Sequence, residues 1–369
     1  MTLLIFLVVL SILILIHEFG HFIIAKRAGV RVEEFALGFP PKIFSKKIGE
    51  TVYSVNALPI GGFVRLFGED EPTKTDSKRS FFAQSMGVKL AVALAGAGMN
   101  ILLGVVIFAI LYSIVGIPTA QKDYVAIGEV ILGTPAQKAG FLEFDRIVSI
   151  GGEEVKTVEE LQATVAKYEE QEVEVLVDRS PVIPLANITI VKEDLADISI
   201  LVTPEKAEGA DRATIGIRPG VIPVSTTTFY PAFEMVGRSI LRGFSDSLVF
   251  AKTIFSALGS MAGNLVVRRE VPADVSGPIG IAVIVGEVYK IGFLPLLSLV
   301  GALSINLAVI NALPFPGLDG ARALFVILQK LTGNRIAPAI EKNIHFIGIV
   351  LLLTLIALIT VRDVGRFFG

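Results

Sequence analysis

The chain has 369 residues, of which 53% are hydrophobic and 18% are charged, and its formal net charge is −2. Soluble domains carry a charge on about one residue in four, so this composition indicates a membrane protein and disfavours a purely soluble one. The sequence contains no cysteine, which excludes disulfides, thiolate metal sites and cysteine nucleophiles. Any zinc site must therefore use histidine and carboxylate ligands.

The first predicted element is an apolar helix over residues 3–25, which is long enough to cross the hydrocarbon core of a bilayer. A signal peptide is the alternative, but it requires basic residues before the apolar segment and a small-residue cleavage site after it. Here the basic residues Lys26, Arg27 and Arg31 follow the segment instead. We therefore expect a retained transmembrane helix.

The loop that follows contains a segment typical of β-structure. Residues 51–66 are rich in β-branched and aromatic residues around Pro59 and the Gly61–Gly62 pair. This composition predicts a β-hairpin within these residues, and the alternative is a surface hairpin without a functional role.

Three further transmembrane helices are expected, at about residues 88–115, 291–313 and 345–361. The segment at residues 229–266 mixes apolar residues with charged ones, so we expect an amphipathic helix that lies along the membrane interface. In the second span three glycines are spaced so that another helix can approach closely: Gly96, Gly98 and Gly104.

A polar insert with strand-like alternation fills about residues 120–220. It contains a short helix that begins at Pro135, a Gly151–Gly152 turn and a capping box formed by Thr157 and Glu160. Strands are expected at residues 172–177, 186–191, 198–203 and 213–217. The order of a Pro-Ala-x-x-Ala-Gly segment, an Asp-x-Ile segment and the Gly-Gly turn resembles a circularly permuted bacterial PDZ domain. A Gly-Leu-Gly-Phe loop is not recognisable, which leaves the capture of peptide C-termini open.

Charge is distributed unevenly along the chain. Eleven basic and seven acidic residues lie between positions 26 and 89, whereas ten basic and nineteen acidic residues lie between positions 117 and 220. Four more basic residues lie between the third and fourth spans: Arg322, Lys330, Arg335 and Lys342. Because Lys and Arg near span ends favour the cytoplasmic side, the first loop and this third connection are expected in the cytoplasm. The acidic insert and both termini are then expected outside the cytoplasm. An even number of spans is consistent with this, because it puts both termini on the same side of the membrane.

A metal-binding pattern lies inside the first predicted span. His17 and His21 are four residues apart on a helix, so both imidazoles project from one face and can reach one ion. In zinc hydrolases with this pattern the glutamate, here Glu18, takes a proton from the attacking water and passes it to the leaving amine. Each ionisable group in hydrocarbon costs about 2–3 kcal/mol or more, so a metal is the natural partner. The alternative is a polar contact between helices.

A catalytic zinc site needs a third protein ligand. His345 is a candidate by residue type, but it begins the fourth predicted span, where an interfacial histidine is common. Asp319 is the better candidate, because residues 311–320 interrupt an apolar span with two prolines and two glycines around this carboxylate. Broken helices at membrane depth are tolerated where they line a site or a cavity. The alternative for Asp319 is an acid at an ordinary helix end.

The His-Glu-x-x-His motif in the first span, with Asn-x-x-Pro-x-Pro-x-Leu-Asp-Gly in a later one, resembles the site-2 protease family of intramembrane zinc metalloproteases, and within it the regulator-of-sigma-E proteases. The resemblance implies that His17, His21 and Asp319 bind Zn²⁺. It also implies that Glu18 is the general base. The second span keeps the glycine and asparagine of the family's Gly-Pro-x-x-Asn motif but lacks its proline. The implied substrate-binding residues are Gly61, Gly62, Asn100, Asn306 and Asn311.

The expected fold is a polytopic α-helical membrane protein with about four transmembrane helices, an inserted PDZ-like α+β domain and a membrane-associated β-hairpin. Residues 1–116 hold the first two spans with the cytoplasmic loop and the hairpin. Residues 117–222 form the PDZ-like domain, residues 223–290 form amphipathic linker helices, and residues 291–369 hold the last two spans with the aspartate motif.

The expected function is that of an intramembrane zinc endopeptidase in the inner or plasma membrane of a bacterium, with its active site toward the cytoplasm. The resemblance implies single-pass membrane proteins as substrates, either anti-sigma factors or remnant signal peptides. The other expected partners are the lipid bilayer and a peptide ligand of the PDZ-like domain, and no nucleic acid is expected. Two alternatives stay open: an inactive PDZ-bearing membrane scaffold, and a soluble-facing zinc peptidase anchored by a tail.

Overall fold

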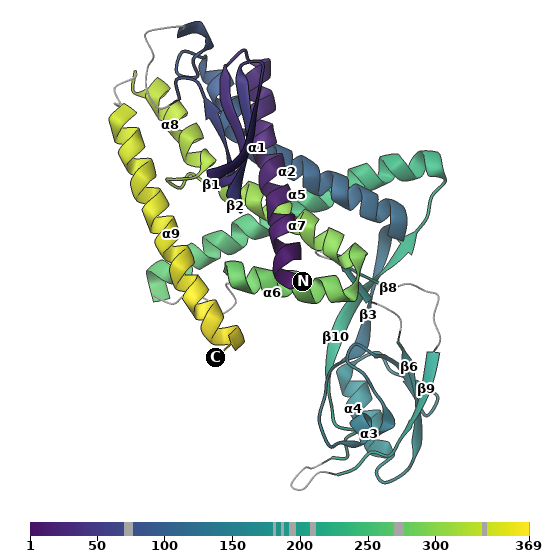
Figure 1. The fold of residues 1–369 in the computed structure, drawn as a ribbon. Helices are drawn as coiled ribbons and strands as arrows, with labels where there is room; N and C mark the ends of the chain where they lie inside the picture. Colours follow the sequence, from purple (N-terminus) through teal and green to yellow (C-terminus); the bar gives the residue numbers. More distant parts are fainter. Residues whose placement is uncertain are drawn as a thin grey trace. The chain divides into compact units, whose positions relative to one another are not determined.

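In the computed structural model the chain divides into two compact units (Figure 1). The membrane unit comprises Met1–Ile110 and Ile240–Gly369, and the inserted unit comprises Leu111–Ser239. The structure describes residues 1–69, 77–179, 182–185, 188–191, 197–206, 212–268, 277–333 and 338–368.

Four helices in the described part of the chain are long and apolar enough to cross a membrane: α1 (Thr2–Arg27), α2 (Met86–Val115), α7 (Phe293–Ala312) and α9 (Pro338–Phe368). They confirm the four predicted spans. With 26 residues, α1 extends about 39 Å, more than the roughly 30 Å of a hydrocarbon core. The longer α9 starts at a proline, where the missing N–H would have no partner within the helix.

The described part of the chain contains three further long helices: α5 (Ala232–Arg268), α6 (Pro278–Ile291) and α8 (Asp319–Leu331). α5 confirms the helix expected at residues 229–266. The third span begins at Phe293 and not at residue 291, because Gly292 has a φ of 149° that interrupts the helical path. α8 was not predicted as a helix.

The start of α6 is held by a carboxylate from the far end of the chain. Asp363 of α9 is 2% exposed and accepts hydrogen bonds from the amides of Gly277 (2.9 Å) and Gly280 (2.8 Å). The first amides of a helix have no partner within the helix, and a negative charge there is favourable. α6 and α9 are therefore joined by a buried polar contact.

Strands β1 (Val32–Ile48) and β2 (Thr51–Leu66) form a sheet beside α1 (Figure 1). The prediction of a hairpin within residues 51–66 is therefore wrong in its bounds, because these residues form one strand of a longer hairpin. Both strands bend, so that residues 34–37 pair on one side with residues 62–65 and on the other with residues 52–55. Among the described residues, the end of β2 thus has a paired neighbour on one side only and forms an edge of the sheet.

Glu34, only 5% exposed, joins several segments of this sheet. Its carboxylate accepts a hydrogen bond from Ser54 Oγ (2.8 Å) and forms ion pairs with Lys42 and Arg65. Burial acts to raise the pKa of Glu34, but the hydrogen bonds from Lys42 and Ser54 and the charge of Arg65 outweigh it, so the pKa is lowered. The carboxylate is therefore ionised at neutral pH.

The inserted unit is built on one sheet in which β3 (Ile117–Val130) and β10 (Ile217–Thr228) pair along most of their length. The other strands are β4 (Arg146–Ile150), β5 (Glu153–Glu154), β6 (Val173–Asp178), β7 (Val182–Leu185), β8 (Ile188–Val191) and β9 (Asp197–Val202). The order is β7-β8-β10-β3-β4-β6-β9, and β5 pairs with β4. Helices α3 (Pro135–Ala139) and α4 (Val158–Lys167) complete this unit.

Most of the predicted local structure of the insert is confirmed. α3 begins at Pro135, and the amide of Glu160 donates to Thr157 Oγ1 (3.1 Å) at the start of α4. The strands predicted at residues 172–177 and 198–203 correspond to β6 and β9. Residues 186 and 187 of the strand predicted at 186–191 lie outside the described residues, and β8 covers the rest. The strand predicted at 213–217 is confirmed only in part, because Thr214 forms an isolated bridge with Glu205 and the continuous strand β10 begins at Ile217.

Candidate metal centre

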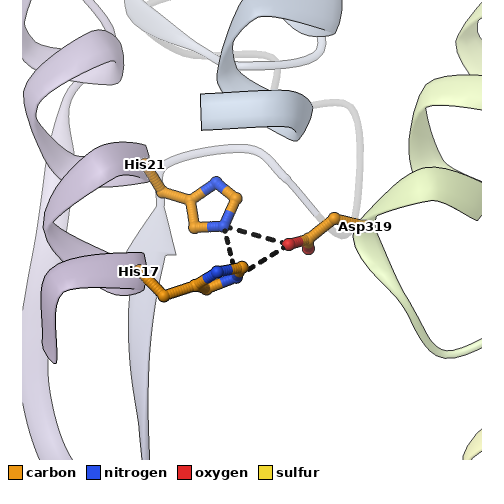
Figure 2. Close-up of side chains that lie close together, drawn as sticks. All are labelled: His17, His21 and Asp319. Carbon is orange, nitrogen blue, oxygen red and sulfur yellow. Dashed lines mark hydrogen bonds and ion pairs between the residues drawn. The ribbon is translucent and has the colours of Figure 1, made fainter. Parts of the chain in front are cut away.

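Two histidines and one aspartate from opposite ends of the sequence meet in the membrane unit (Figure 2). His17 and His21 lie one turn apart on α1, and Asp319 is the first residue of α8. The Oδ2 atom of Asp319 lies 2.9 Å from His17 Nε2 and 3.2 Å from His21 Nε2. The two Nε2 atoms are 3.2 Å apart. The three atoms therefore surround a common point.

These separations fit one metal ion. A tetrahedral zinc ion with bonds of about 2.0–2.1 Å to imidazole nitrogen and carboxylate oxygen holds neighbouring ligand atoms about 3.3 Å apart. Two imidazoles and one carboxylate are also a ligand set that zinc hydrolases use. Three protein ligands leave one position for water or substrate, which is the arrangement of a catalytic and not a structural zinc site.

The two imidazole rings are held from behind by α2. His21 Nδ1 lies 2.7 Å from the carbonyl oxygen of Val92. A carbonyl only accepts, so Nδ1 carries the proton and Nε2 keeps its lone pair toward the centre. The side-chain amide of Asn100, which is fully buried, lies 3.4 Å from His17 Nδ1. Such contacts fix the tautomer and the orientation of a metal-binding histidine.

The position of α2 depends on glycines at its contact with α1. A β-carbon on Gly20 would lie 2.4 Å from the carbonyl oxygen of Ala95, and one on Gly96 would lie 2.4 Å from His21 Nε2. The predicted close approach is confirmed at Gly96 and at Gly104, where a β-carbon would lie 2.6 Å from Ile305 of α7. It is wrong for Gly98, where a β-carbon would meet nothing within 4 Å.

Asp319 is electrostatically suited to bind a cation. Burial alone would raise the pKa of its carboxyl group, but the adjacent imidazoles of His17 and His21 outweigh burial and hold that pKa well below its usual value. The group is therefore a carboxylate, which is the form that binds metals.

The centre opens onto a cavity of about 650 Å³ in the membrane unit, which Glu18, His21 and Asp319 help to line. The backbone of β2 passes directly beside Glu18, since a β-carbon on Gly62 would lie 3.2 Å from Glu18 Cγ. Part of the wall is aromatic and consists of Phe39, Phe63, Phe81, Phe82 and Phe346. The cavity thus brings together the Glu18 carboxylate, two of the three candidate metal ligands, the backbone of β2 and an apolar wall.

The other predicted site residues lie at different places. Asn306 and Asn311 are on α7, are partly buried, and are not among the residues that line this cavity. Asn100 lies behind His17 and not on the cavity wall. A β-carbon on Gly61 would lie 2.2 Å from the ring of Phe39, so this glycine leaves room for an aromatic side chain.

Two residues near the centre, Gly20 and Val92, were not predicted to contribute, and a third, His345, was considered only as a ligand. Gly20 lies within the motif, and a small residue there could have indicated close helix packing. Val92 acts through its backbone carbonyl, which leaves no signal in the sequence. His345 was considered as a ligand, but its Nδ1 accepts a hydrogen bond from the amide of Gly317 (3.1 Å), and it is not part of the three-residue cluster.

Comparisons with known proteins identify the family of the chain. The model of peptidase family M50 matches residues 5–355. The chain is similar to a predicted zinc metalloprotease of Clostridium acetobutylicum, with 32% identity over 96% of this chain and 94% of the relative. It is 30% identical to zinc metalloprotease RasP of Oceanobacillus iheyensis, over 100% of this chain and 99% of the relative. It is 28% identical to the regulator of sigma-W protease RasP of Bacillus subtilis, again over 100% and 99%.

The match extends over nearly the whole chain and includes both segments that form the centre. The predicted family, the zinc dependence and the membrane location are thereby confirmed. The chain belongs to peptidase family M50, the site-2 proteases, and is a membrane-embedded zinc metalloprotease.

Proposed function

We propose that His17, His21 and Asp319 bind the zinc ion of this protease and that Glu18 is its general base. One observation carries the proposal: the ligand atoms of the three residues lie 2.9 Å to 3.2 Å from one another, beside a cavity that Glu18 also lines. The hydrogen bond from His21 Nδ1 to the Val92 carbonyl supports the same assignment, because it leaves the lone pair of Nε2 free to bind the metal.

Glu18 and the ligands have separate roles in peptide hydrolysis. When bound, zinc polarises the scissile carbonyl and lowers the pKa of water to about 7. Glu18 accepts a proton from the attacking water and donates it to the leaving amine, as a general base and then a general acid. Asn100 keeps the His17 ring in place, and its carbonyl oxygen is available to Nδ1–H if the amide rotates.

Metal analysis and cleavage of a model transmembrane substrate test these roles together. We expect Glu18→Gln to keep zinc at the parent level and to lose cleavage, whereas Asp319→Asn loses both. Asp246→Asn on α5, a carboxylate paired with Arg242, is the control and keeps both. Zinc retained at full occupancy by Asp319→Asn, or equal cleavage by Glu18→Gln and the parent, would contradict the assignment.

The substrates are single-pass membrane proteins of the anti-sigma-factor type, or remnant signal peptides. The name of the Bacillus subtilis relative, a regulator of sigma-W protease, supports the first class. A substrate helix must unwind to expose a peptide bond, and in lipid its freed amides need new partners. The one-sided edge at residues 62–66 lies next to Glu18 and offers such partners by strand addition. Two asparagines of α7, Asn306 and Asn311, also hold the unwound backbone of the substrate.

Disulfide trapping tests strand addition, because the chain contains no native cysteine. In a Glu18→Gln background we expect Val64→Cys to crosslink to a cysteine near the scissile bond of the substrate. Ser45→Cys, on the segment that pairs only with residues 51–55 at the opposite edge, is the matched control. Equal crosslinking at both positions would contradict substrate binding at the β2 edge.

The inserted unit is PDZ-like and binds a peptide. Support comes from the short helix α3, the helix α4 and the buried Asp145, whose carboxylate accepts hydrogen bonds from the Leu142 amide (2.8 Å) and from Arg179 Nε (2.7 Å). The uneven charge supports a location of this unit and of both termini outside the cytoplasm of a bacterial cell, with the metal centre toward the cytoplasm. A membrane-impermeant thiol reagent should label Lys156→Cys and not Lys47→Cys in intact cells.

A further inference from the structure

We propose that His345 is a positioning residue for the zinc site: it holds the loop that carries Asp319 by accepting a hydrogen bond from the amide of Gly317 (3.1 Å between N and Nδ1). This inference rests on the proposed role of Asp319 as a zinc ligand. His345 lies on α9, a helix that contributes none of the three proposed ligands.

The loop between α7 and α8 depends on support from outside itself. Its internal hydrogen bonds join the Phe315 amide to the Leu313 carbonyl (2.7 Å) and the Leu318 amide to the Phe315 carbonyl (3.0 Å). The Gly317 amide has its partner in His345 instead. Gly317 also has a φ of 98°, which side-chain-bearing residues rarely adopt. The conformation two residues before Asp319 is therefore fixed by contact with α9.

The surface of α9 is shaped to receive this loop. His345, Gly348 and Ile349 are three and four residues apart, so they share one face of the helix. A β-carbon on Gly348 would lie 2.1 Å from the carbonyl oxygen of Pro316, and one on Gly317 would lie 3.1 Å from the Ile349 amide. The loop thus lies against bare backbone of α9, and His345 supplies the hydrogen-bond acceptor at that contact.

His345 also contacts the chain on the other side of Asp319. Its ring packs against Phe325 of α8, with 5.6 Å between the ring centres. Since Nδ1 accepts from Gly317, the neutral ring carries its proton on Nε2, which is buried and has no partner among the described residues. One side chain therefore touches the loop before the ligand and the helix after it. Groups that hold a ligand in this way typically contribute 10–100-fold to metal affinity.

Two amide substitutions separate the hydrogen bond from the bulk of the ring. In His345→Asn the side-chain oxygen can take the place of Nδ1 and accept from Gly317, whereas in His345→Gln the amide reaches the place of Nε2. Zinc affinity of the full-length protein in detergent, measured by chelator competition, should fall 10–100-fold in His345→Gln and less than about threefold in His345→Asn. The visible spectrum of the Co²⁺-loaded protein should shift only in His345→Gln. Both variants should elute from a size-exclusion column at the volume of the parent, which shows that they are folded.

Asp319→Asn in the same assay separates this inference from the assignment beneath it. Zinc lost by Asp319→Asn and weakened in His345→Gln but not in His345→Asn supports both. Zinc lost by Asp319→Asn but bound normally by His345→Gln, or weakened equally in both His345 variants, overturns the positioning role alone. Zinc bound at parent affinity by Asp319→Asn, or absent from the parent, overturns the ligand assignment and the positioning role with it.

Discussion

Gly96 of α2 lies so close to His17 of α1 that a β-carbon on Gly96 would be 2.5 Å from His17 Nε2. The same carbon would lie 2.4 Å from His21 Nε2. The space beside Gly96 is therefore occupied by the two imidazole rings. The proposed metal site depends on the packing of α2 against α1 as much as on the motif within α1.

A single methyl group at this contact should disturb the site. Gly96→Ala forces the rings or the helices apart, and we expect at least a tenfold loss of zinc affinity by chelator competition, since misplaced ligands weaken metal binding. Gly98→Ala is the control on the same helix, where a β-carbon has open space. If both alanine variants bind zinc as the parent does, the packing of α2 at Gly96 does not hold the ligands in place.

Asn100 and Asn311 should differ in what they contribute. Asn100→Leu removes the polar contact behind His17, so zinc affinity should fall about 10–100-fold. Asn311→Leu lies away from the cluster and should leave zinc binding unchanged while raising KM for a transmembrane substrate. Zinc titration and steady-state cleavage of both variants check this. Unchanged zinc affinity in Asn100→Leu, or weakened zinc affinity in Asn311→Leu, would contradict the two roles.

The β1–β2 sheet should loosen at acid pH through Glu34. Because the folded-state pKa of Glu34 is lowered, its contribution to stability is complete above the ordinary glutamate pKa of about 4.3 and is lost as the pH falls further. Glu34→Gln should show faster hydrogen exchange in β2 at pH 7, where the parent is protected. The exchange rates of the two proteins, corrected for intrinsic pH effects, should converge at the acid end. Equal protection of both at pH 7 would show that the carboxylate does not hold the sheet.

Two neighbouring exposed positions in the inserted unit should respond oppositely to glycine. Phe144 has a φ of 70°, and its amide donates to the Ile127 carbonyl (2.7 Å), so a bulky residue is held in the left-handed region at a cost of about 1–2 kcal/mol. Phe144→Gly relieves this cost and should stabilise the unit or leave it unchanged. Leu142→Gly only increases the chain entropy of the unfolded state, so it should destabilise the inserted unit by about 0.5–1 kcal/mol. Hydrogen exchange of β4 amides in the full chain measures both, and a less stable Phe144→Gly would argue against backbone strain.

The spans and the three-residue cluster were accessible from sequence because their signals are local. Helical spacing puts His17 and His21 on one face, and the broken span before Asp319 indicates a carboxylate at a site. The supports of the cluster were not accessible, because they arise from tertiary packing. The Val92 carbonyl faces His21 only because α1 and α2 cross at small residues, and His345 supports the loop only because α9 packs against it.

Dependence on tertiary contacts also explains why the strand bounds were predicted wrongly. Alternation and β-branched residues marked residues 51–66 as β-structure, but the pairing of that strand with β1 depends on contacts between segments and not on composition. In the insert, a strand is predicted at residues 213–217, but Thr214 forms only an isolated bridge with Glu205, and continuous pairing with β3 begins at Ile217.

Zinc K-edge X-ray absorption of the purified full-length protein tests the central assignment most directly. The chain contains three histidines, so the number of bound imidazoles distinguishes the possible ligand sets. We expect two imidazoles and oxygen ligands at about 2.0–2.1 Å, with the zinc signal lost in Asp319→Asn. A site with three imidazoles would place His345 on the metal, and a site that Asp319→Asn leaves unchanged would exclude the carboxylate; either result would contradict the account.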